Sequence, residues 1–431
     1  MSPRDSYGYA LTTATSAAEA YDAGLLDVLR LRTGALDHFA ESIVHDPTFA
    51  LGHAALALLG HELCAPVDVD ARLRQARLHA GRGDERERSH VHAVVAHIGG
   101  DSRPLIDHLA AYPRDALLLS TAVPTIAFAG ATEVPEEAWA IVERAAPAYG
   151  DDWWYAGLLA FIRTEQLRFD EAMELSCRSL AVVPGAGHSA HARAHAHYET
   201  GDHESGLAWM DAWVLGDGAE IDSLSHFSWH AALHELSLGD LDAVRRRYRT
   251  QLQPGNALGC RALVDSGSLL FRWALTPGAS AVPDMSEVLR VTGETTLERP
   301  ATPFLALHAA VALLAIGDTV RLDALARWAG GHAHATMREV VAPLTVALGL
   351  MATDRPGEAA DRLAVLAPSI RRLGGSDAQR EVVEEARIAA LLRADRWDEA
   401  RILLDARLER RRSPRDERWR RTLPATAAGS R

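Results

Sequence analysis

Alanine and leucine recur along this chain at spacings of three and four residues. Two examples are Leu51–Ala54–Ala55–Leu58–Leu59 and Leu305–His308–Ala309–Leu313. Because an α-helix has about 3.6 residues per turn, this spacing places the apolar side chains on one face of a helix. The alternating pattern of a strand is almost nowhere sustained, and Ala and Leu are strong helix formers. The sequence therefore predicts an all-α protein.

The predicted helices are grouped in pairs. A short turn carrying Gly or Asp, followed by an acidic helix start, recurs at 168–172, 201–206, 239–243, 354–359 and 395–400. Within each run of neighbouring turns, the first three and the last two, the intervals are about 32 to 41 residues, close to the ~34-residue tetratricopeptide repeat. The acidic residue is expected to cap the positive end of the next helix. Since one helix pair cannot bury its apolar face alone, we expect a curved solenoid with an internal groove or pocket.

Three regions are expected along the chain. N-terminal helices occupy residues 1–45, a tetratricopeptide-like repeat array occupies 46–423, and a disordered tail occupies 424–431, where small residues dominate. The stretch from Arg407 onward is dense in arginine. Such a stretch is typical of a solvated, frayed end or of a tail that binds an acidic partner. Of the two, we expect the solvated end.

Charge and cysteine content exclude several classes of function. The formal net charge of −13 argues against nucleic acid as a partner. There is no apolar run long enough for a membrane span, and the N-terminus has no apolar signal core. The three cysteines, Cys64, Cys177 and Cys260, are too widely spaced for a CxxC metal site. We therefore expect a cytoplasmic protein that associates with neither membrane nor nucleic acid.

Histidine is abundant, with 20 residues in 431, and two groups have helical spacing. The first group, at i, i+3 and i+7, consists of His188, His191 and His195. The second group, at i, i+4 and i+8, consists of His226, His230 and His234. Each group forms a stripe on one helix, whereas His197 points to another face of the first helix. Because the stripes are about one repeat apart, we expect them to face each other across the groove.

Three interpretations of the paired stripes remain open. Histidines in helices often make ordinary packing contacts. Imidazole also titrates near neutral pH, so an interior cluster can act as a general acid or base or bind an anionic substrate. Finally, two histidines at i, i+4 can share a zinc or iron ion, and a second pair would complete four nitrogen ligands, although the HExxH motif is absent. The candidate catalytic or metal-binding histidines are His191, His195, His226 and His230.

Other polar residues are candidates for the same site. Asp265 lies in an otherwise apolar helical stretch, where a buried carboxylate needs a partner. Asp265 is expected to orient one of the histidines or to pair with Arg272, seven residues later. A glycine-rich turn at 374–376 precedes Gln379 and Arg380 at a helix start. The turn either presents backbone N–H groups to an anion or is a simple helix cap.

These motifs together resemble the family of tetratricopeptide-repeat protein 38, which occurs in bacteria and animals. The residues that carry the resemblance extend over nearly the whole chain and are Asp46–Pro47–Thr48–Phe49, His53, Arg86–Glu87–Arg88, His90, His191, His195, His197, His226, Trp229–His230, Asp265–Ser266, Arg272, His308 and 373–380. His188 and His234 depart from the family's pattern, which weakens the picture of two three-histidine stripes. The resemblance implies an all-helical repeat fold and a site built from histidines, but no particular reaction.

The prediction for function is a small-molecule pocket inside the curve of the array. The four histidines and Asp265 would act as acids, bases or ligands, with zinc, iron or no cofactor. The predicted ligand-binding residues are His53, His90, His197, Trp229, Arg272, His308, Gln379 and Arg380. The alternative is a scaffold that holds a partner peptide in its groove. Grooves of that kind favour Asn, Lys and Arg, so histidine and tryptophan here favour the pocket.

Overall fold

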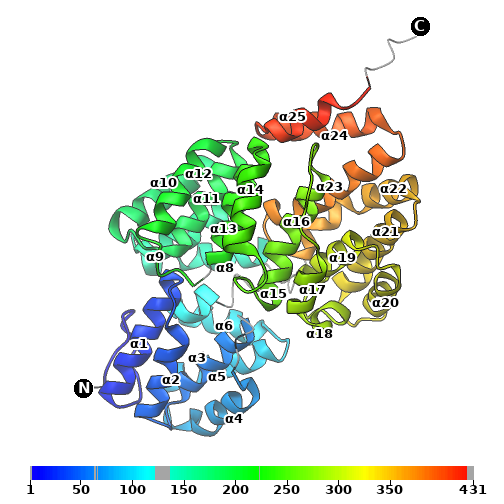
Figure 1. Cartoon of the computed structure of the whole chain (residues 1–431). Coiled ribbons are helices and arrows are strands. Elements are labelled where there is room, and N and C mark those ends of the chain that lie inside the picture. The colour runs from blue at the N-terminus through cyan, green and yellow to red at the C-terminus, as the bar shows by residue number, and fades with distance from the viewer. Residues whose placement is uncertain (1, 63–64, 66, 122–135, 223, 425–431) are drawn as a thin grey trace.

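The computed structural model describes residues 2–62, 65, 67–121, 136–222 and 224–424 (Figure 1). Within these residues the chain is helical, and its only β-type pairing is three isolated bridges, which confirms the predicted all-α class. Cys64 and residues 425–431 of the predicted tail lie outside this part. No helix in the described ranges combines the length and the apolar character that crossing a bilayer requires.

The helices follow one another in three stretches. The N-terminal stretch consists of α1 (Thr15–Arg30), α2 (Ala35–His45), α3 (Ala50–Glu62), α4 (Val69–His79), η1 (Ala80–Arg82), α5 (Glu85–Ile98) and α6 (Arg103–Ala111). The middle stretch consists of α8 (Glu136–Tyr149), α9 (Trp153–Glu165), α10 (Phe169–Val182), α11 (Gly187–Glu199), α12 (His203–Leu215), α13 (Leu224–Leu238), α14 (Leu241–Arg247) and the π-helical η2 (Tyr248–Leu252). The last stretch consists of α15 (Gly259–Arg261), the π-helical η3 (Ala262–Gly267), α16 (Ser268–Leu275), α17 (Ser286–Thr292), α18 (Glu294–Glu298), α19 (Pro303–Ala315), α20 (Thr319–Gly330), the π-helical η4 (Met337–Val341), α21 (Ala342–Ala352), α22 (Pro356–Leu366), the 3₁₀-helical η5 (Ala367–Leu373), α23 (Asp377–Arg393), α24 (Trp397–Arg410) and α25 (Pro414–Arg421).

Consecutive helices pack against each other in pairs, among them α9 with α10 and α21 with α22. The predicted turns lie at the junctions of these pairs, directly before α10, α12, α14, α22 and α24. The expected capping by acids holds for α14, where Asp240 accepts the backbone N–H of Ala243 at 2.9 Å. An arginine precedes α10, α22 and α24 instead, and the acids lie in the first turn, where they still favour the positive helix end.

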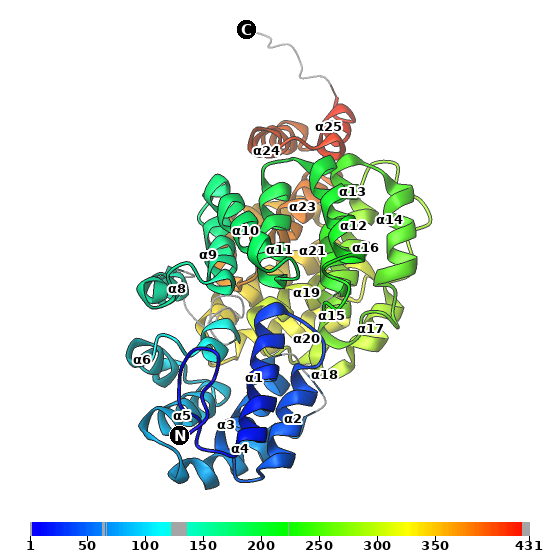
Figure 2. The ribbon, with the colours of Figure 1, turned by 90° about the vertical axis from the view of Figure 1, so that its left-hand side faces the viewer.

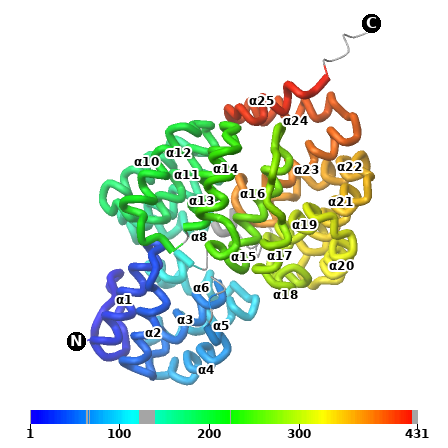
Figure 3. The backbone as a smooth tube through the Cα atoms, viewed as in Figure 1, coloured from blue at the N-terminus to red at the C-terminus, as the bar shows by residue number. Residues whose placement is uncertain are grey.

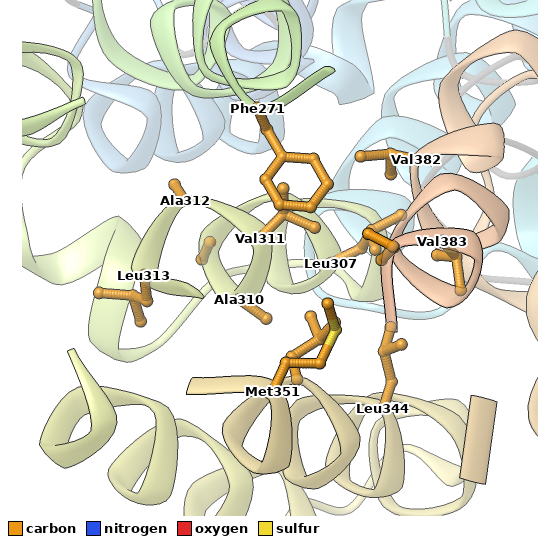
Figure 4. Close-up of a cluster of buried hydrophobic side chains, with 14 of the residues drawn as sticks. Phe271, Leu307, Ala310, Val311, Ala312, Leu313, Leu344, Met351, Val382 and Val383 are labelled. Atoms are coloured by element: carbon orange, nitrogen blue, oxygen red, sulfur yellow. The ribbon is translucent and has the colours of Figure 1, made fainter. Parts of the chain in front are cut away.

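The largest part of the core lies between the last helix pairs. Figure 4 shows Phe271 of α16 above Leu307 and Val311 of α19, with Met351 of α21 below them and Val382 of α23 beside them. All of these side chains are buried. The middle helices are arranged so that α11 lies between α9 and α13 (Figure 2). This arrangement brings the two histidine-bearing helices, α11 and α13, next to each other.

The C-terminal helices pack back against the middle of the chain (Figure 3). Here α23 contacts α11 and α16, and α25 contacts α13. The expectation of a solvated, frayed arginine stretch is wrong in part, since the described residues form α24 and α25 as far as Arg421 and only some of the arginines are exposed. Arg407, Arg411 and Arg415 are buried, because they pair with the acids Glu381 and Glu385 of α23. Buried charges of opposite sign thus hold this end of the chain in place.

Candidate functional site

The candidate site lies between α11 and α13. His191 and His195 are one turn apart on α11, and His226 and His230 are one turn apart on α13. The neighbouring helix α9 approaches α11 closely because Gly157 has no side chain. A Cβ atom at this position would lie 3.0 Å from the backbone nitrogen of Ser189. Small residues at the helix contact therefore position the two histidines of α11.

The Nε2 atoms of the four imidazoles form a chain of short contacts in the order His195, His191, His226 and His230. The Nε2 of His191 lies 3.2 Å from that of His195 and 3.0 Å from that of His226. The Nε2 atoms of His226 and His230 are 3.2 Å apart. One ligand atom from each of His191, His195 and His230 lies within 4.8 Å of the others. The structure thus brings together all four histidines predicted to be catalytic or metal-binding.

Asp265 is the partner of a histidine and not of Arg272, which is one of the two alternatives predicted from the sequence. The Nδ1 of His226 lies 2.9 Å from the Asp265 Oδ1, so the ring donates its Nδ1 proton to the carboxylate and turns Nε2 toward the cluster. Asp265 is 1% exposed and lies in η3, where the wider π-helical turn interrupts the α-helix. A carboxylate behind a histidine in this way is the usual second layer of a metal site.

Burial keeps most of the cluster neutral. His195 and His230 are 2% and 1% exposed, whereas His191 and His226 are partly exposed. Loss of hydration lowers the pKa of His195 to about 3, and the nearby His226 and Arg380 act in the same direction. For the same main reason, burial, the pKa values of His191 and His230 lie well below the ordinary value. Neutral imidazoles keep a free lone pair, which is the form that binds metal ions.

Aromatic rings enclose the cluster on two sides. Trp229, predicted to bind ligand, stacks on His226 with ring centroids 5.6 Å apart and is fully buried. Phe161 of α9 stacks on His191 at 5.1 Å and meets the edge of His195 at 5.3 Å. Phe161 was not predicted, because nothing in the local sequence distinguishes it from other core residues of α9. Both rings fix the imidazole planes and exclude water.

Ordinary hydrogen bonds do not account for the three contacts within the cluster. A ring nitrogen presents either one proton or one lone pair along a single direction. The Nε2 atoms of His191 and His226 each face two other Nε2 atoms. A hydrogen bond needs an N–H on one side and a lone pair on the other. If the His226 proton is on Nδ1 and each ring carries one proton, the protons cannot be placed so that each of the three contacts has an N–H and a lone pair of its own. A bound cation would remove this conflict, because the rings would direct lone pairs at it and not at each other.

Two other histidine groups in the described residues need no ion. In the buried pair His203–His234, the Nδ1 atoms are 3.1 Å apart, and the Nε2 of His203 donates to the carbonyl of Arg412 at 2.9 Å. One proton per ring satisfies both of these contacts. The rings of His90 and His108 both donate to the same Oδ2 of Asp115, at 2.7 and 3.1 Å. That cluster is a hydrogen-bonded ion-pair network with its carboxylate oxygen already occupied.

The other predicted ligand-binding residues in the N-terminal and middle stretches lie apart from the cluster. The Nε2 of His53 donates to the carbonyl of Pro47 at 3.0 Å, and His90 belongs to the Asp115 network. His197 faces away from the cluster, as predicted, and its Nδ1 lies 3.2 Å from the Asp202 carboxylate. His188 lies about one turn before His191 on α11, and it is not a member of any of the three Nε2–Nε2 contacts.

Arg272 and His308 make different contacts from those proposed. The partner of Arg272 is not Asp265 but Glu385 of α23, at 3.2 Å, and the guanidinium also donates to the carbonyl of Ala378 at 2.6 Å. Arg272 is 1% exposed and holds two helices together. His308 is also 1% exposed, and its Nδ1 donates to the carbonyl of Phe304 at 2.9 Å.

The glycine-rich turn before α23 is a helix cap. The side chain of Ser376 accepts the backbone N–H of Gln379, and Gln379 accepts the N–H of Ser376 in return, at 3.3 and 2.9 Å. Arg380 is buried and pairs with Glu165 at 3.3 Å. Burial raises the pKa of Glu165 to about 7 despite this arginine. Glu165 was missed, because its environment is created by a helix more than 200 residues away.

No known family model matches this chain.

Proposed function

We propose that this protein is a tetratricopeptide-like helical array that binds one zinc or iron ion through His191, His195, His226 and His230, and that it uses the ion on a small molecule. The observation that carries the proposal is the set of contacts within the cluster: three Nε2–Nε2 distances measure 3.0 to 3.2 Å, and His191, His195 and His230 each offer one ligand atom within 4.8 Å of the others. Bonds of 2.0–2.1 Å to one ion would separate the nitrogens by about 2.9 Å at right angles and about 3.4 Å in a tetrahedron. The observed separations lie between these limits.

The chemistry of the ligands favours this group of metals. Imidazole nitrogen suits zinc, iron, copper and nickel, whereas calcium and magnesium prefer oxygen. Four neutral ligands leave the ion its full charge, which supports Lewis-acid catalysis or activation of water. Asp265 would supply the single negative charge of the second layer through His226. All five of these residues are also among those that carry the resemblance to the family of tetratricopeptide-repeat protein 38.

The test is elemental analysis of tag-free protein purified without chelators. We expect about one equivalent of zinc or iron per chain, and loss of that metal in His195→Ala. The control is His197→Ala, on the same helix but facing Asp202, which should keep the metal. Circular dichroism on each variant checks that the helices are intact.

A second measurement separates specific binding from contamination. Protein stripped of metal is refilled with cobalt(II), whose visible absorption reports nitrogen ligands at low coordination number. Saturation at one equivalent in the wild type and its absence in His195→Ala are expected. A folded wild-type protein that takes up no ion of this group contradicts the proposal.

A further inference from the structure

A pocket of about 330 Å³ lies beside the cluster. One side of it is apolar and comes from the first helices, with Val28, Leu31, Leu36 and Leu59. The other side is polar and includes His188, Asp222 and Arg261. The first helices are fixed to this second side, since the backbone N–H of Asp222 donates to the Leu31 carbonyl at 2.8 Å. The pocket therefore has a built wall on each side.

Each polar wall residue precedes a residue of the site by three or four positions. His188 precedes His191 by three residues on α11, and Asp222, in the turn before α13, precedes His226 by four. Arg261, at the end of α15, precedes Asp265 by four residues along the same continuous helix. Three separate segments thus run from the pocket into the histidine site, so the pocket and the site are neighbours.

The cluster also opens in the direction of the pocket. Side chains on a helix lean toward its N-terminus. The partly exposed histidines, His191 and His226, are the N-terminal members of their two pairs. The buried histidines, His195 and His230, are one turn farther from the pocket. A ligand in the pocket therefore approaches the ion from the side of His191 and His226.

The charges of the pocket identify the group that it can bind. Arg32 pairs with Glu220, Asp27 is hydrogen bonded to His38, and Glu62 is hydrogen bonded to His97. Asp37 and Asp222 are exposed at the rim.

Arg261 differs from these side chains, because its guanidinium has no hydrogen bond or ion pair with any other described residue. The Nε2 of His188 is also buried without a hydrogen-bond partner in the described ranges. Arg261 is therefore the cation that a ligand can reach, and His188 Nε2 is the polar atom that it can satisfy.

We propose that this pocket binds the substrate, a small molecule with an oxyanion group that pairs with Arg261 and an apolar part that packs against Leu31 and Leu36. The proposal rests on the metal site proposed above. Arg261 lies four residues, about one helical turn, before Asp265, whose carboxylate contacts His226 of the cluster, so the anchor and the metal site are held by neighbouring turns of one helix. The oxyanion is a carboxylate or a phosphate, which an arginine recognises through the same paired N–H donors.

Three hydroxamic acids test the pocket, because a hydroxamate binds the metal and leaves its side chain to occupy the pocket. Butyrohydroxamic acid has a neutral chain, succinic monohydroxamic acid ends in a carboxylate, and 3-phosphonopropionohydroxamic acid ends in a phosphonate. Affinity is measured by calorimetry on the metal-loaded protein. We expect one of the charged compounds to bind about 10- to 100-fold more tightly than the neutral one, as a charge-assisted hydrogen bond to arginine provides. The charged compound with the larger gain in affinity over the neutral one shows whether the oxyanion is a carboxylate or a phosphate.

The variant that decides the role of the arginine is Arg261→Gln, with Arg32→Gln as its matched control in the same pocket. The preference for the charged compounds should disappear in Arg261→Gln and persist in Arg32→Gln, with unchanged metal content in both. A preference that survives in Arg261→Gln, or that is absent from the metal-loaded wild type, overturns the pocket proposal alone. Failure of the metal site itself shows differently, since all three compounds would then bind equally poorly and no metal would be found.

Discussion

At the scale of single residues, Asp265 determines how well His226 serves the cluster. Its carboxylate is buried and lies 2.9 Å from the His226 Nδ1, which sets the tautomer and the direction of Nε2. Replacing Asp265 with Ala removes this acceptor and leaves the ring free to rotate. We expect the affinity for the metal to fall about 10- to 100-fold, the usual effect of losing such a partner. Competition with a chromogenic chelator measures this loss.

The neighbouring residue offers a control for local disturbance of η3. Ser266 is fully buried, and its hydroxyl donates to the carbonyl of Leu252 at 2.5 Å, away from the histidines. Ser266→Ala should lower thermal stability without changing the metal affinity. Equal losses of metal affinity in the two variants would show that Asp265 acts only through packing.

At the scale of elements, the spacing of α9 and α11 sets the position of the site. A side chain at Gly157 would lie 3.0 Å from the backbone nitrogen and 3.2 Å from the Cα of Ser189. Backbone cannot move aside as a flexible side chain does, so Gly157→Ala must push the helices apart. We expect a cost of about 1–3 kcal/mol in the free energy of unfolding, seen as a lower melting temperature, and weaker metal binding.

The matched control is Gly349→Ala in α21. A Cβ atom there meets nothing within 4 Å, so the change should be neutral or stabilising by about 0.5–1 kcal/mol through helix propensity. If Gly157→Ala melts as Gly349→Ala does, close approach of α9 is not what positions α11.

Local spacing explains which parts of the fold and site could be predicted. The i, i+4 pairs on α11 and α13 follow from helical geometry alone, as do the helix starts at Leu241 and Pro356. His234 does not join the cluster, because eight residues advance a helix by about 80° beyond two full turns. It meets His203 instead.

Contacts between distant segments could not be predicted from spacing. Arg272 pairs with Glu385, 113 residues away, and Arg380 pairs with Glu165, 215 residues away. The same reason explains why the arginine stretch after Arg407 was predicted to be solvated. Its buried arginines pair with Glu381 and Glu385 of α23, and only the packing of the last helices brings these charges together.

At the scale of the whole molecule, burial of neutral histidines makes the fold sensitive to acid. Loss of hydration lowers the pKa of His308 from 6.5 to about 4, and the pKa of His203 is also lowered to about 4. Between these values the unfolded chain binds protons that the folded chain does not. Stability is therefore fully present above pH 6.5 and is lost as the pH falls toward 4, by up to about 3 kcal/mol for each such group.

A substitution of His308 isolates one part of this dependence. His308 is buried in α19, and its Nδ1 is hydrogen bonded to the carbonyl of Phe304, so His308→Leu removes a titrating group while keeping an apolar contact. In metal-free protein, the melting temperature of the wild type should decrease from pH 7.5 to pH 5, and that of the variant should decrease less. The carboxylate of Glu385 does not interfere, because its pKa is lowered from 4.5 to about 2 and its contribution to stability is lost only at lower pH. Equal decreases in the two proteins would mean that His308 becomes protonated inside the folded protein, and that its burial does not govern the acid response.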